Sequence, residues 1–146
     1  RIGGESDNLL FGFNEFDMPV EKEKSFLESI NKSNNSIMLI GMIEDEVVSV
    51  ASLQGFNRKR IAHRGNMAIS VKKKFWHCGI ATGMITELKE FAQKAGISVI
   101  ELEVRSDNVN AIALYEKMSF EKIGTYKNFL RINEKFYDCY LMNLYL

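Results

Sequence analysis

The sequence contains little of the residue types that mark several specialised classes of protein. Only two of its 146 residues are cysteine and only one is proline, so we expect neither a disulfide framework nor a proline-rich linker. Cys78 and Cys139 are expected in a loop and in a late strand, which does not suggest a pair. The two histidines, His63 and His77, form no zinc-type array with these cysteines, so no metal is predicted. A reducing cytoplasm is the expected location.

The sequence also lacks long apolar runs and an excess of one charge. Its apolar runs fall far short of the roughly 20 residues that a membrane span needs, and its first residues lack the pattern of a signal peptide. Nineteen basic residues balance nineteen acidic ones, so no overall positive field favours nucleic acid or anionic membranes. Basic residues at 58–60 and Arg64 gather locally, but no recognition motif accompanies them. We therefore expect neither a nucleic-acid nor a membrane partner.

The length and hydrophobic content of the chain are sufficient for one folded domain over residues 1–146. Hydrophobic residues make up 46% of the chain, and the sequence has no internal repeat or low-complexity stretch. Apolar periodicity predicts helices over 20–34, 79–95 and 109–118. Alternation predicts strands over 36–43, 46–56, 61–71, 97–104, 120–132 and 135–145.

The order of these elements indicates an α/β fold with a mixed, mostly antiparallel sheet. Turns at Glu44-Asp45 and Asn133-Glu134 are expected to join antiparallel neighbours. The strand over 61–71, the helix over 79–95 and the strand over 97–104 imply a right-handed parallel crossover. Helices would then cover the faces of the sheet.

The segment from Trp76 to Thr82 leads from a predicted strand into a predicted helix. Such a helix start has about four N–H groups without intrahelical partners and roughly half a positive charge, so it attracts anions. Gly79 would let an anion approach the backbone, and Thr82 would add a hydroxyl donor. The loop alone also fits an ordinary strand-to-helix turn, and the lysines at 72–74 fit either a steering cluster or a solvated turn.

A second motif is more specific and carries a family resemblance. Residues 108–120 read Asn-Val-Asn-Ala-Ile-Ala-Leu-Tyr-Glu-Lys-Met-Ser-Phe, which resembles the Asn-x-x-Ala-x-x-Leu-Tyr-Glu-Lys-x-Gly-Phe motif of the GNAT superfamily of acyl-CoA N-acyltransferases. The spacing of Trp76, Gly79 and Ala81 is similar to that family's Gln/Arg-x-x-Gly-x-Gly/Ala signature. Trp76 replaces the usual polar residue, and Ser119 replaces a glycine, which predicts a different backbone geometry in that turn. The resemblance covers residues 36–145, whereas residues 1–35 match poorly.

The resemblance implies a single N-acetyltransferase domain with helices on both faces of the sheet. It also implies that the strand over 66–71 splays from its parallel neighbour over 97–104, and that acetyl-CoA binds in the gap. The pantetheine arm would pair with the backbone of one strand, and the diphosphate would lie on the loop. The implied cofactor-binding residues are Ile69, Val71, Trp76, His77, Cys78, Gly79, Ile80, Ala81, Thr82 and Asn108.

Tyr115 and Glu103 are the candidate catalytic residues. Reference pKa values of roughly 10 for a phenol and 8.5 for a thiol let Tyr115 stay protonated and donate to a departing thiolate. A strand backbone N–H near Ile69 to Val71 would stabilise the oxyanion. An attacking amine must first lose a proton, and Glu103 lies on the polar face of its predicted strand. The alternatives are a core aromatic for Tyr115 and a solvated carboxylate for Glu103.

These residues predict an enzyme that transfers an acetyl group from acetyl-CoA to a primary amine by direct attack. Cys78 has no His or Asp partner pattern, so no acyl-enzyme is expected. The acceptor would be a small-molecule or peptide amine, which the sequence does not identify, and a homodimer stays open. The alternative hypothesis is a noncatalytic acyl-CoA-binding or regulatory module.

Overall fold

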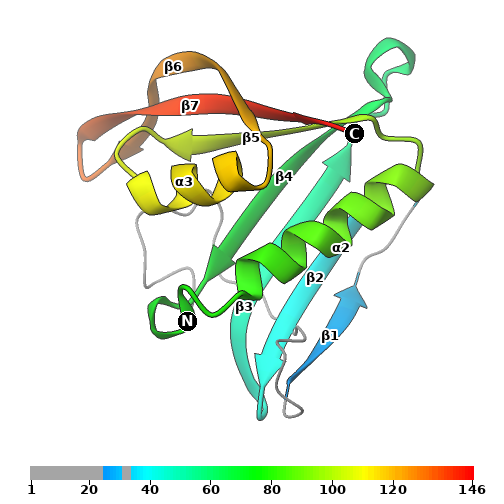
Figure 1. Ribbon diagram of the computed structural model, residues 1–146. Coiled ribbons are helices and arrows are strands. Elements are labelled where there is room, and N and C mark those ends of the chain that lie inside the picture. The colour runs from blue at the N-terminus through cyan, green and yellow to red at the C-terminus, as the bar shows by residue number, and fades with distance from the viewer. Residues whose placement is uncertain (1–24, 31–33) are drawn as a thin grey trace.

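The computed structural model describes residues 25–30 and 34–146, which form one seven-stranded sheet with two α-helices (Figure 1). The strand order is β1-β2-β3-β4-β5-β7-β6, and β4 with β5 is the parallel pair. The strands are β1 (Ser25–Ile30), β2 (Ser36–Ile43), β3 (Glu46–Gly55), β4 (Arg64–Val71), β5 (Val99–Arg105), β6 (Glu121–Ile132) and β7 (Lys135–Tyr145). The helices are α2 (Ile80–Lys94) and α3 (Val109–Lys117), with 3-10 turns η1 (Lys59–Ile61) and η2 (Lys73–Phe75). The predicted mixed, mostly antiparallel fold is confirmed.

The helix predicted over residues 20–34 is wrong where the structure describes it. Ser25–Ile30 is a strand that pairs antiparallel with β2, with Leu27 opposite Gly41 and Ile30 opposite Met38. A short apolar run fits either period, and the hydrogen-bonding edge of β2 decides between them, because strand preference depends on tertiary context. The rest of that prediction, at 20–24 and 31–33, lies outside the described residues.

Two tight turns set the register of the antiparallel hairpins. Glu44 and Asp45 have φ of 50° and 70°, and Asn133 and Glu134 have φ of 51° and 65°. Positive φ at both central residues matches the right-handed twist of the flanking strands. Both predicted turns are confirmed. The strand predicted over 61–71 starts later, at Arg64, because η1 occupies Lys59–Ile61.

Helix α2 covers β2, β3 and β4 with one apolar face (Figure 1). Its buried side chains are Ile80, Met84, Ile85, Leu88 and Ala92. The Ser49 hydroxyl lies 3.2 Å from the Met84 sulfur, which places the odd-numbered residues of β3 beneath this helix. Neither of the two described α-helices is long and apolar enough to cross a membrane.

Helix α2 ends as the sequence predicts, at Gly96. This residue has φ of 81°, and the Ile97 N–H donates to the Ala92 carbonyl at 2.8 Å. These features form a Schellman motif, in which a left-handed residue lets the next N–H reach back to the helix. The chain is thereby returned toward β5.

Candidate functional site

Strands β4 and β5 separate after a short parallel ladder. Only three residue pairs join them, from Arg64 opposite Val99 to Asn66 opposite Glu101. In contrast, β5 pairs with β7 along its whole length, from Val99 to Arg105. Residues 67–71 of β4 therefore diverge from β5, and Figure 1 shows this divergence. The predicted splay is confirmed.

The ladder with β3 determines which backbone groups of β4 point toward this gap. The Lys72 N–H donates to the Val48 carbonyl at 2.8 Å, and the Phe56 N–H donates to the Arg64 carbonyl at 3.1 Å. Even-numbered residues of β4 therefore direct their backbone toward β3, and odd-numbered ones direct theirs toward β5. No described strand pairs with Ile69 or Val71 on that side. A linker with peptide-like amides would find donors and acceptors there.

The Trp76 side chain hydrogen-bonds to one of these unpaired backbone groups of β4. Its indole Nε1 donates to the Val71 carbonyl at 2.7 Å, so the loop folds back onto the end of β4. Backbone groups of Ile69 and Val71 are expected to pair with a pantetheine arm, and in this structure the Val71 carbonyl already has a partner. Trp76 thus shapes the loop where the family signature places a polar side chain.

The N-terminus of α2 is open in the way that an anion requires. Gly79 precedes the helix with φ of 83°, makes no side-chain cap, and would place an added Cβ in open space. The first helical hydrogen bond runs from the Gly83 N–H to the Gly79 carbonyl at 3.1 Å. The preceding N–H groups, of Ile80, Ala81 and Thr82, have no intrahelical partner. These residues fit a diphosphate held mainly by the backbone.

The side chains of this loop contribute less than its backbone. The Ile80 side chain lies in the core, whereas His77, Cys78 and Thr82 are exposed. His77 has φ of 64°, an uncommon conformation for a residue with a side chain. The Cys78 sulfur lies 3.6 Å from the Trp76 carbonyl oxygen and has no His or Asp partner among the described residues.

The lysines before the loop are partly neutralised. Glu46 accepts a hydrogen bond from Lys72 at 2.9 Å and lies 3.6 Å from Lys74. The hydrogen bond from Lys72 is the main reason that the pKa of Glu46 is lowered. Lys73 lies instead beside the Trp76 ring, with its ammonium 6.0 Å from the ring centroid. The attraction of this cluster for an anion is weaker than three free ammonium groups would give.

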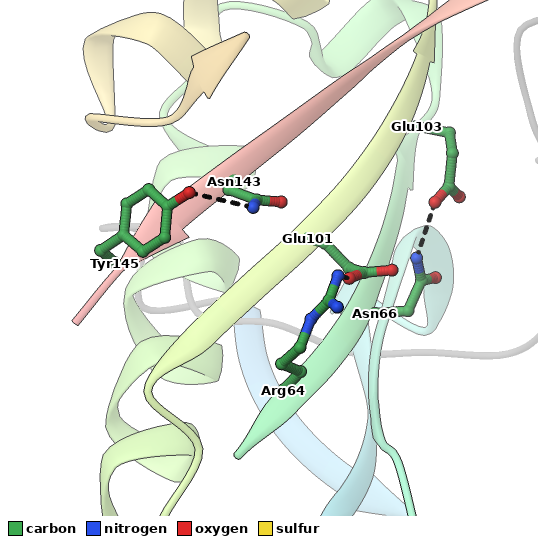
Figure 2. Close-up of polar contacts among 6 residues, drawn as sticks. All are labelled: Arg64, Asn66, Glu101, Glu103, Asn143 and Tyr145. Carbon is green, nitrogen blue, oxygen red and sulfur yellow. Dashed lines mark hydrogen bonds and ion pairs between the residues drawn. The ribbon is translucent and has the colours of Figure 1, made fainter. Parts of the chain in front are cut away.

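Glu103 lies at the start of the gap, on the sheet face opposite α2. The Asn66 amide donates to its carboxylate at 3.0 Å, and beside this pair Arg64 pairs with Glu101 (Figure 2). The pKa of Glu103 is raised above its usual value, chiefly by burial and further by the charge of Glu101, against the opposing effect of the Asn66 hydrogen bond. A raised pKa makes a carboxylate a better base near neutral pH.

Two buried side-chain polar atoms on β4 and β7 have no hydrogen-bond partner among the described residues. They are the Oδ1 atom of Asn143 and the hydroxyl of Ser70. Asn143 lies on β7 opposite Glu101, and its amide nitrogen lies 3.2 Å from the Tyr145 hydroxyl oxygen (Figure 2). Sequence reasoning did not single out these two residues or Asn66.

Tyr115 is held in the core by the end of α3. The Phe120 N–H donates to the Tyr115 carbonyl at 2.9 Å, and the Ser119 N–H donates to the Glu116 carbonyl at 3.0 Å. These bonds form a Schellman motif whose characteristic apolar contact is the packing of the Phe120 ring against the Tyr115 ring, with centroids 5.7 Å apart. Burial raises the pKa of the Tyr115 phenol far above its usual value, so the hydroxyl keeps its proton.

Ser119 corrects a prediction from the sequence. A different turn geometry was expected because serine replaces the family's glycine, but Ser119 has φ of 78°, the left-handed conformation that glycine favours. The two hydrogen bonds at the end of α3 impose this geometry, because both require a left-handed residue at this position. The turn keeps its shape at the cost of strain in one residue.

The start of α3 is fixed by Asn108. Its side-chain oxygen accepts a hydrogen bond from the Ala111 N–H at 3.2 Å, which confirms the predicted N-cap. Just before it, Arg105 makes a two-pronged contact with Asp107, with distances of 3.0 and 2.8 Å, and stacks 3.9 Å from the Tyr137 ring centroid. A role of Asn108 in holding the cofactor stays a prediction.

The structure brings the predicted residues together as two groups. Ile69, Val71 and residues 76–82 lie along one edge of the gap and the adjoining loop, while Glu103 lies on the other strand. No described contact joins Glu103 to Tyr115. No group of three or more His, Cys, Asp or Glu that would hold a metal occurs in the described part of the chain.

The site thus consists of a splayed parallel strand pair beside an open helix N-terminus. The chain belongs to the acetyltransferase (GNAT) family, whose model matches residues 8–120 and thus begins inside the segment that the motifs left unmatched. It is 30% identical over 105 residues to the L-amino acid N-acetyltransferase AaaT of Escherichia coli, which covers 71% of this chain. The chain spans 65% of the length of that relative.

Solved structures show the same fold. An acetyltransferase of the GNAT family from Streptococcus pneumoniae superposes with a TM-score of 0.74 at 31% identity, covering 79% of this chain and 70% of that one. YncA, a putative acetyltransferase from Salmonella typhimurium solved with its cofactor acetyl-CoA, superposes with a TM-score of 0.69 at 17% identity, covering 76% and 65%. At that identity the second likeness concerns the fold alone.

Proposed function

We propose that this protein transfers an acetyl group from acetyl-CoA to a primary amine by direct attack, without an acyl-enzyme. The observation that carries the proposal is the end of the β4–β5 ladder after three residue pairs, beside a helix start that Gly79 leaves open. When bound, acetyl-CoA supplies an activated thioester carbonyl and a thiol leaving group. The family match and the name of the L-amino acid N-acetyltransferase relative support this reaction.

The two faces of the sheet would separate the two substrates. The loop at 76–82 and the start of α2 lie at the end of β4, where they would hold a diphosphate. Glu103 and Asn66 lie on the face opposite α2. An amine that approaches from the Glu103 side would therefore meet the thioester through the gap, without competing with the cofactor for space.

Glu103 and Tyr115 would handle the two protons of the reaction. An ammonium group has no lone pair, so the Glu103 carboxylate would accept its proton, directly or through water. The raised pKa of Glu103 makes its carboxylate a better proton acceptor near neutral pH. The Tyr115 hydroxyl keeps its proton in the free protein because of burial. It would give this proton to the departing thiolate and would regain one from the attacking nitrogen, which loses its second proton as the amide forms.

The surroundings of Cys78 support direct attack. An acyl-enzyme needs a nucleophile beside a base, and Cys78 is an exposed loop residue without such a partner among the described residues. The acceptor would be a free amino acid, a peptide N-terminus or another small amine. The name of the relative places L-amino acids first in the panel to be tested.

Thiol release from acetyl-CoA, measured across a panel of L-amino acids, peptides, polyamines and aminoglycosides, tests the proposal. We expect turnover with at least one class, and a loss of about 10²- to 10⁴-fold in kcat for Tyr115→Phe, which removes only the donated proton. Tyr126→Phe is the matched control, because Tyr126 is exposed on β6 and should leave kcat unchanged. Stoichiometric CoA binding without turnover on any amine would favour the noncatalytic module instead.

A further inference from the structure

Asn66 lies at the last residue pair before β4 and β5 separate. Its backbone partner on β5 is Glu101, but its side-chain amide donates to Glu103, two residues further along and level with the start of the gap. Figure 2 shows the amide and the carboxylate facing each other across the two strands. One side chain therefore links the closed end of the ladder to the candidate base.

The contact holds one carboxylate oxygen and leaves the other. Nδ2 of Asn66 donates to Oε2 of Glu103, so this bond leaves lone pairs on Oε1 for a proton or an amine. The other hydrogen bond to this carboxylate comes from the backbone of Glu103 itself. Asn66 is the only side chain among the described residues that donates to this carboxylate. Fixing one oxygen restricts the rotation of a side chain that would otherwise sample several rotamers.

The neutral amide suits this task better than a cation would. A nearby Arg or Lys lowers the pKa of a carboxylate by about one to three units, which weakens it as a base. Of the neighbouring cations, Arg64 pairs with Glu101 and Arg105 pairs with Asp107. The hydrogen bond from Asn66 therefore orients the Glu103 carboxylate, and no ion pair with a described residue lowers its pKa.

We propose that Asn66 is a positioning residue for Glu103, holding its carboxylate at the start of the gap where the acceptor amine must lose a proton. This inference rests on the proposed function, in which Glu103 is the base. It extends that function to a residue of the opposite strand that does not itself react.

The charged groups around Glu103 set the direction of its titration. On β5 they are Glu101, which raises its pKa, and Arg105; on β4 the charged residue is Arg64, which pairs with Glu101. On β7 the buried Cys139 thiol, whose pKa is raised to about 11, stays protonated and uncharged at neutral pH. Within the described chain, Asn66 and Glu101 are thus the two neighbours whose removal should move the Glu103 pKa in opposite directions.

The test is a titration of the Glu103 carboxyl carbon by NMR in the free protein, combined with the pH profile of kcat/KM. Asn66→Ala removes a hydrogen bond that favours the charged form, so the pKa should rise and the acidic limb should move to higher pH. Glu101→Gln removes a like charge, so both should move to lower pH. For Asn66→Ala we also expect kcat to fall about ten- to hundredfold. The KM for acetyl-CoA should be unchanged, because the misplaced Glu103 carboxylate acts only on the amine.

Opposite shifts separate positioning from simple destabilisation, which would lower activity in both variants without opposite movements of the pKa. Absence of a shift in Asn66→Ala, or shifts of the same sign in both variants, would overturn the proposal. The NMR titration needs no substrate, so its result can be interpreted even if no amine is acetylated. Unchanged kcat/KM in Glu103→Gln would instead refute Glu103 as the base, and the positioning role with it.

Discussion

At the level of single residues, Gly79 combines a backbone conformation that disfavours a side chain with open space around it. Its φ is 83° and an added Cβ would meet nothing within 4 Å. Gly79→Ala should therefore lower the free energy of unfolding by about 1 kcal/mol through strain alone. The new methyl would lie where a diphosphate is expected, so the Kd for CoA should rise at least about tenfold. Calorimetric titration with CoA and thermal unfolding measure the two effects.

Two other glycines separate strain from cofactor contact. Gly96 has φ of 81° and equally open space but lies at the far end of α2, so Gly96→Ala should lose stability and keep its CoA affinity. Gly124 lies in a strand, has open space around it and does not have positive φ. Gly124→Ala should therefore change neither the stability nor the CoA affinity strongly. If Gly79→Ala bound CoA as tightly as the wild type, the loop would not be the diphosphate site.

At the level of elements, the end of α3 contains a residue in a strained backbone conformation. Ser119 takes the left-handed conformation of a C-terminal glycine, with φ of 78°, so that Phe120 can pack on Tyr115. Ser119→Gly should raise the free energy of unfolding by up to about 1 kcal/mol, because glycine adopts this conformation without a Cβ clash. Urea denaturation of the variant measures the gain.

The equivalent position at the end of α2 provides the reverse experiment. Gly96 closes the same motif there, so Gly96→Ser should cost about as much as Ser119→Gly gains. A loss of stability in Ser119→Gly would mean that the Ser119 side chain makes a contribution larger than the strain.

At the level of the whole molecule, one hydrophobic core joins the two strands that separate at the site. Leu102 lies in this core on β5, is 2% exposed, and alternates with Glu101 and Glu103 on the opposite face. Leu102→Ala should lower the free energy of unfolding by about 2–5 kcal/mol, because it removes buried apolar surface and leaves a cavity. Chemical denaturation checks this value.

Val109 provides the comparison for that substitution. It is 70% exposed at the start of α3, so Val109→Ala should stay within about 0.5 kcal/mol of the wild type. A comparably small effect of Leu102→Ala would show that β5 does not depend on this core.

Local sequence signals predicted much of the fold because each acts over a few residues. The apolar stripe of α2, its stop at Gly96, the cap at Asn108 and the turn at Asn133-Glu134 depend on near neighbours alone. The strand at Ser25–Ile30 was missed because its character comes from pairing with β2. Ser119 was misjudged because bonds at the end of α3 impose its conformation.

The sequence by itself determined the order of most elements, the α2 loop, and the motif that carries Tyr115, because periodicity and chain neighbours encode these features. The separation of β4 from β5 is implied by the family resemblance. Only the tertiary structure decided that the ladder ends at the pair of Asn66 and Glu101, that Trp76 bonds to Val71, and that Asn66 reaches Glu103. Asn66 and Glu103 are 37 residues apart in the chain. Their contact depends on the register of two strands joined by a helix, which no local pattern encodes.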